Sequence, residues 1–133
     1  MKYLGVEDVL LLHQMAVEKT GGVHGLRSFE LLESAVHRCR ASFGGRNLYP
    51  NLFLKAGSLL HSVIKNHAFA DGNKRTGIYS AMTMIELNGY NFECAQEELV
   101  NFSIDIDVKN TGLEEIASWL KKHSRKMARK SFA

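Results

Sequence analysis

Apolar residues recur about every three to four positions along almost the whole chain, and a single proline, Pro50, interrupts 133 residues. This spacing is typical of amphipathic α-helices, and proline is the residue that most strongly breaks them. The clearest case predicts a helix that is capped by Asn51 and buries Phe53, Ala56, Leu60, Val63 and Ile64. The pattern therefore predicts a single-domain, all-α bundle with little or no sheet.

Caps and glycines set the expected ends of about six helices. The first is expected from Val6 to just before the Gly21-Gly22 pair, and the second from its cap, Ser28, to about Arg40. The second helix should bury Phe29, Leu32, Ala35 and Val36. The others are expected over about 51–67, 73–88, 96–107 and 113–129, with Tyr90 to Glu93 extended.

The net charge of +3 is unevenly distributed along the chain. Six of the 17 basic residues lie between Lys121 and Ala133, where there is no acidic residue, so residues 1–120 carry a charge of −3. We therefore divide the chain into a domain over 1–122 and a basic tail over 123–133. The acidic body argues against direct DNA binding. The tail fits either the cationic end of a solvated helix or a contact with an acidic partner or RNA.

Several further features favour a cytoplasmic protein without a membrane partner. No apolar run approaches the ~18 residues of a membrane span, and Glu7 and Asp8 interrupt the N-terminal segment where a signal peptide would be apolar. The two cysteines, Cys39 and Cys94, are too few for a disulfide framework and lack metal-site spacing. We expect both to be reduced and to lie in or near the core.

Residues that could bind a ligand or take part in catalysis are concentrated in one segment, HAFADGNKRT, at positions 67–76. It is expected to join the end of one helix to the start of the next, where unpaired backbone N–H groups and the helix dipole attract anions. Gly72 allows close approach of the backbone to a ligand. Lys74 and Arg75 place two cations where the dipole alone would disfavour them. The segment therefore predicts a polyphosphate site, although it lacks the motif of a P-loop.

Two further residues of this segment could add catalytic chemistry. Asp71 would suit Mg²⁺ beside phosphates, and His67 could accept a proton from a hydroxyl near neutral pH. Phe69 is expected to insert into the core and hold the loop. Each residue alone also fits an ordinary structural role, and it is their combination that favours a site. The other histidines show no ligand spacing and are interpreted as structural: His13, His24, His37, His61 and His123.

The segment resembles the Fic/Doc signature, H-x-F-x-[DE]-[GA]-N-[GK]-R, in the form typical of the death-on-curing (Doc) branch, and the similarity extends over about residues 3–122. The resemblance implies a Fic/Doc-type helical bundle in which SFGGRNLYP (42–50) is a short extended flap that docks a target peptide by strand addition. It implies His67 as general base and Asp71 as the Mg²⁺ ligand. It assigns the phosphates to Gly72, Asn73, Lys74 and Arg75, of which Arg75 also stabilises developing charge.

Two positions distinguish the branches of this family. Fic adenylyltransferases have glycine in place of Lys74 and a second arginine in place of Ile78, so transfer of AMP is disfavoured here. Similarity to the Doc branch implies a toxin that transfers the γ-phosphate of ATP to a Ser or Thr hydroxyl of a translation protein such as elongation factor Tu. It also implies a small antitoxin partner. Adenylyl or other nucleotidyl transfer, and a non-catalytic binding module with the same fold, remain as alternatives.

Overall fold

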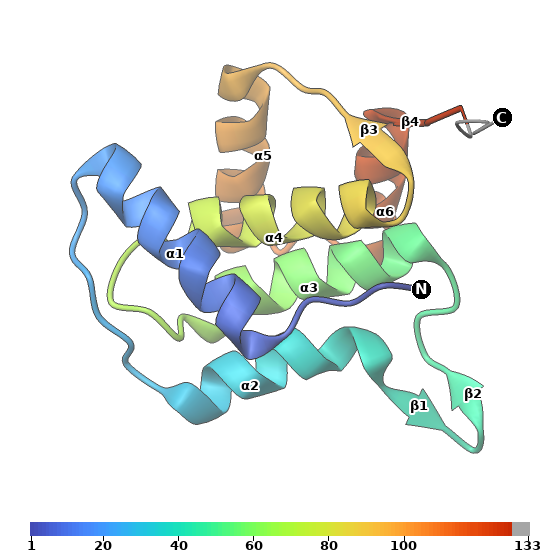
Figure 1. Cartoon of the computed structure of the whole chain (residues 1–133), viewed down its shortest axis with the longest axis horizontal. Helices are drawn as coiled ribbons and strands as arrows, with labels where there is room; N and C mark the ends of the chain where they lie inside the picture. The colour runs from blue at the N-terminus through green and yellow to red at the C-terminus, as the bar shows by residue number, and fades with distance from the viewer. Residues whose placement is uncertain (129–133) are drawn as a thin grey trace, which may run out of the picture.

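Six α-helices and two short strand pairs make up residues 1–128, the part of the chain that the computed structural model describes (Figure 1). This arrangement confirms the predicted all-α class and the number of helices. None of these helices has the length and apolar character needed to cross a membrane. In chain order they are α1 (Val6–Thr20), α2 (Phe29–His37), α3 (Leu52–Asn66), α4 (Asn73–Leu87), α5 (Gln96–Lys109) and α6 (Leu113–Lys122), with a 3₁₀ turn, η1 (Arg38–Arg40), after α2.

Helix α3 forms the centre of the core and lies beside α4 (Figure 1). All five residues of its predicted apolar stripe are buried. Gly77 of α4 allows the two helices to approach closely, because a Cβ there would lie 3.1 Å from side-chain atoms of Leu60 and Ile64 and 3.2 Å from the Leu60 carbonyl oxygen. The loop between α3 and α4 carries the segment that the sequence analysis singled out.

The predicted caps of α2 and α3 are confirmed. Ser28 Oγ accepts a hydrogen bond from Leu31 N at 3.1 Å, and Asn51 Oδ1 accepts one from Leu54 N at 3.0 Å. The prediction that Phe29 is buried is wrong, since it is 49% exposed. Phe29 is the first residue of α2, and the packed face of that helix begins one turn later, at Leu32.

The predicted flap is a short antiparallel hairpin of β1 (Ser42–Phe43) and β2 (Arg46–Asn47) that extends away from the helices (Figure 1). Its turn consists of Gly44 and Gly45, which both adopt positive φ angles, +59° and +78°. Phe43 is 82% exposed. The hairpin thus presents its backbone and one aromatic ring to solvent.

The final helix is shorter than predicted. It ends at Lys122 instead of near Arg129, which itself lies outside the described residues, and the chain continues as β4 (Ser124–Lys126), antiparallel to β3 (Tyr90–Phe92). Ser124 Oγ donates to the Leu120 carbonyl at 2.7 Å and helps to close the helix. The basic tail predicted over 123–133 therefore begins with a strand that pairs with the body of the domain.

Candidate functional site

The loop between α3 and α4 is held from inside by Asn73, the first residue of α4. Its side chain is buried, accepts from Phe69 N at 3.1 Å and donates to the Phe69 carbonyl at 3.0 Å. Outside, the loop pairs with the segment before α2, where Arg27 N donates to the Ala68 carbonyl at 2.7 Å. The backbone of the loop is therefore fixed on both sides.

Phe69 is 1% exposed, which confirms its predicted insertion into the core. Its ring stacks on the imidazole of His13 in α1, with centroids 3.7 Å apart and an interplanar angle of 6°. His13 Nε2 also donates to the Asp71 carbonyl at 2.8 Å. His13, interpreted from sequence only as structural, thus supports the loop, and its position 58 residues before Asp71 left no local signal of this role.

The N-terminus of α4 has the features of an anion site. Gly72 occupies the N-cap with φ +79°, no side chain caps the helix, and its first turn contains no acidic residue. The first backbone N–H groups of a helix have no partner within the helix itself. Lys74 and Arg75 follow directly, so two cations add to the positive end of the dipole.

The carboxylate of Asp71 is oriented by two backbone groups. Oδ1 accepts from Gly72 N at 2.9 Å and Oδ2 accepts from Val23 N at 3.2 Å. Gly22 makes room for it, since a Cβ at Gly22 would lie 2.6 Å from Asp71 Oδ2. Asp71 is exposed, and each oxygen can accept more than one bond. A fixed, accessible carboxylate beside a phosphate site fits the oxygen ligands that Mg²⁺ prefers.

His67 is the C-cap of α3 and adopts a left-handed backbone conformation, φ 47° and ψ 47°. Its side chain is 48% exposed, and Nε2 lies 3.5 Å from Asp107 Oδ1. The other oxygen of Asp107 lies 3.5 Å from Lys74 Nζ. Asp107 of α5 therefore joins the imidazole to the start of α4. The sequence analysis missed Asp107, because it stands in another helix with no motif around it.

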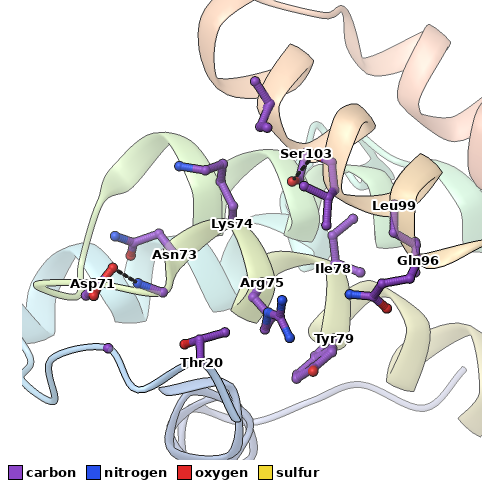
Figure 2. A pocket seen from close by; sticks show the side chains of 14 residues that line it. Thr20, Asp71, Asn73, Lys74, Arg75, Ile78, Tyr79, Gln96, Leu99 and Ser103 are labelled. Atoms are coloured by element: carbon purple, nitrogen blue, oxygen red, sulfur yellow. Dashed lines mark hydrogen bonds between the residues drawn. The ribbon is translucent and has the colours of Figure 1, made fainter. Parts of the chain in front are cut away.

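A pocket of about 340 Å³ opens between α1, α4 and α5 (Figure 2). Five of the six predicted site residues line it, and Figure 2 shows Arg75 between Thr20 of α1 and Tyr79 of α4. His67 does not line the pocket and lies beside it, on the side of Lys74 and Asp107. The apolar part of the lining, called the apolar wall, consists of Ile78 from α4 and of Leu99, Val100 and Ile104 from α5. A polyphosphate end and an apolar wall together suit an anionic ligand with a flat, less polar group.

Comparisons with a family model and with two known proteins all point to one family. The family model "Fic/DOC family" matches residues 3–85. The protein named "Toxin Doc" of Mycolicibacterium smegmatis is 36% identical over 124 residues, which cover 90% of this chain and 91% of that protein. "Protein kinase doc" of Escherichia phage P1 is 27% identical over 89 residues, which cover 67% of this chain and 70% of that protein.

Proposed function

The chain belongs to the Fic/DOC family, within the death-on-curing branch, and we propose that it is a toxin that transfers the γ-phosphate of ATP to a Ser or Thr hydroxyl of a protein. One relative is named as a toxin and another as a protein kinase. A translation protein such as elongation factor Tu is the proposed target, a small antitoxin the proposed partner, and the cytoplasm the proposed location.

The observation that carries the phosphate-transfer proposal is the pair Lys74 and Ile78. Lys74 occupies the position that glycine has in Fic adenylyltransferases, and its Nζ is drawn toward Asp107 at 3.5 Å. Ile78, at the position of their second arginine, is 5% exposed and contributes to the apolar wall. The pocket therefore lacks that second arginine and carries extra bulk at the helix N-terminus, which disfavours a nucleotide seated for AMP transfer.

Each group of the loop would have a separate role in the proposed reaction. The backbone N–H groups at the start of α4, with Lys74 and Arg75, would hold the phosphates and offset the charge that develops during transfer. Asp71 would hold Mg²⁺ against phosphate oxygens, where the ion would neutralise part of that charge. His67 would accept the proton of the target hydroxyl as its oxygen bonds to the γ-phosphorus. The bond from the γ-phosphorus to the bridging oxygen breaks, and ADP leaves.

The β1–β2 hairpin supports the proposed docking of a protein target. Its exposed backbone edge and the ring of Phe43 could receive an extended peptide by strand addition. The hairpin precedes the N-terminal end of α3, whereas His67 caps its C-terminal end, about 22 Å away along the helix, so a docked peptide would have to extend along α3 to reach the base.

Labelled ATP tests the reaction directly. The purified chain is incubated with cell extract and ATP labelled at either the γ- or the α-phosphate, in the presence of Mg²⁺. We expect label on a protein from the γ position only, and none with the His67→Asn variant. Label from the α position only would indicate nucleotidyl transfer. No label from either, with growth arrest that survives His67→Asn, would indicate a non-catalytic binding module.

A further inference from the structure

A second cluster of reactive side chains lies outside the proposed nucleotide site. It consists of Cys94 just before α5, Glu98 in the first turn of α5, and His123 at the end of α6. The thiol sulphur, a carboxylate oxygen and an imidazole nitrogen all lie within 4.8 Å of one another. Glu98 and Asp107 are nine residues apart on α5, roughly 13 Å along the helix, so this cluster is separate from the Asp107 end.

The orientation of His123 leaves a nitrogen available to the cluster. Nδ1 donates to the Trp119 carbonyl at 2.9 Å, so in a neutral ring the lone pair is on Nε2. Nε2 lies 3.0 Å from Glu98 Oε1. The two atoms are therefore close enough to coordinate one metal ion together. A backbone carbonyl that fixes one ring nitrogen is also the usual support of a metal-bound histidine.

The surroundings hold the His123 ring in place. The His123 ring packs beside Trp119, with centroids 4.4 Å apart, and its side chain is 13% exposed. Cys94 is half-buried and unpaired with the other cysteine, so its sulphur is free to serve as a ligand.

We propose that Cys94 Sγ, a Glu98 carboxylate oxygen and His123 Nε2 form a binding site for a divalent transition-metal ion of the zinc type. The mixed sulphur, nitrogen and oxygen set suits Zn²⁺ better than Mg²⁺ or Ca²⁺, which take oxygen ligands. Three protein ligands leave the fourth tetrahedral position to water. One thiolate and one carboxylate balance the charge of the ion. Bound there, the metal joins the start of α5 to the end of α6, next to the β3–β4 pair.

Titration of the purified full chain with Co²⁺, followed by Zn²⁺, tests the site. We expect one equivalent of Co²⁺ to give a thiolate-to-cobalt charge-transfer absorption that Zn²⁺ abolishes, and Zn²⁺ to raise Tm in proportion to its occupancy. A spectrum without this band, or binding well below one equivalent, would overturn the proposal.

Variants assign the ligands and separate this site from the nucleotide site. Cys94→Ser should abolish the charge-transfer band, and Glu98→Gln and His123→Gln should each weaken Zn²⁺ binding at least tenfold. Cys39→Ala, at the other cysteine, and Asp71→Asn, at the proposed Mg²⁺ ligand, should bind as the wild type does. Binding that is unchanged in Cys94→Ser would refute the site. Should a ligand variant fail to fold by circular dichroism, the cobalt spectrum of the wild-type chain decides.

Discussion

Asp107 Oδ1 lies 3.5 Å from His67 Nε2, and this contact joins the proposed base to a carboxylate on a different helix. A nearby carboxylate stabilises the positive charge that the imidazole would acquire on accepting a proton. Both groups are partly exposed, so solvent weakens the interaction.

The Asp107→Asn variant should therefore reduce kcat by roughly two- to fivefold, the range expected for a partly exposed ion pair. KM for ATP should change less than kcat, because in the proposed site the backbone N–H groups of α4 would provide most of the phosphate contacts. Steady-state phosphotransfer assays measure both constants. Asp105→Asn, on the same helix and paired with Lys109, is the matched control and should behave as wild type. Equal losses in the two variants would contradict a role for Asp107 beside the base.

The His67→Asn variant should lose roughly 10²–10⁴-fold of activity, as expected when a general base is removed. Asparagine is preferred to alanine because position 67 has φ 47°, a conformation that asparagine tolerates. The free energy of unfolding in urea should change by no more than about 1 kcal/mol, since the side chain is half exposed. A large loss of stability would instead assign His67 a structural role.

The Gly22→Ala variant should weaken binding of ATP in the presence of Mg²⁺ by roughly tenfold, about 1.4 kcal/mol. The added Cβ would lie 2.6 Å from Asp71 Oδ2 and displace the carboxylate, while the backbone at Gly22 has no positive φ angle that excludes alanine. Isothermal titration calorimetry with and without Mg²⁺ measures the change. Gly112→Ala, where the new methyl group meets no atom within 4 Å, serves as the control. Unaltered affinity in Gly22→Ala would argue against Asp71 as the metal ligand.

The stability of the fold should depend on pH through His61. Burial, and then the cations Arg38 and Lys65, lower the pKa of His61 below its ordinary value of 6.5, and the neutral ring accepts a hydrogen bond from Arg38 at 2.8 Å. The unfolded chain therefore binds a proton more readily than the folded chain does. This contribution to stability is fully present above about pH 6.5 and is lost as the pH falls through the depressed pKa of the folded state.

Accordingly, the free energy of unfolding of His61→Gln should fall less than that of the wild type between about pH 7.5 and about pH 5. Urea denaturation of both proteins at several pH values measures this. The other histidines are common to both proteins, so the difference isolates His61. Parallel curves would show that the ring titrates alike in the two states.

The sequence was sufficient to predict those helix ends that local chemistry determines. Ser28 and Asn51 cap their helices through bonds to residues three positions later, which a sequence pattern can reveal. The end of α6 depends instead on β3, about thirty residues earlier, which pairs with residues after Lys122. The spacing of apolar residues carries no information about pairing with a distant strand, and so the predicted helix was too long.

The same distinction applies to the candidate site. The residues that form the anion-binding end of α4 are consecutive, from Asp71 to Arg75, and could be identified together. His13 and Asp107 reach the loop from α1 and α5, and only tertiary packing brings them there. The apolar pocket residues that come from α5, Leu99, Val100 and Ile104, were missed for the same reason, because their spacing is that of any amphipathic helix.

Gly77 links the close packing of α3 on α4 to the geometry of the loop between these two helices. Any side chain larger than the hydrogen atom of Gly77 would force α3 and α4 apart. The proposed base lies at the C-terminal end of α3, and the proposed phosphate site lies at the N-terminal end of α4. The geometry of the proposed site therefore depends on a helix contact that lies outside the pocket. A Gly77→Ala substitution would therefore push α3 and α4 apart and shift the proposed base relative to the start of α4, without changing any residue that lines the pocket.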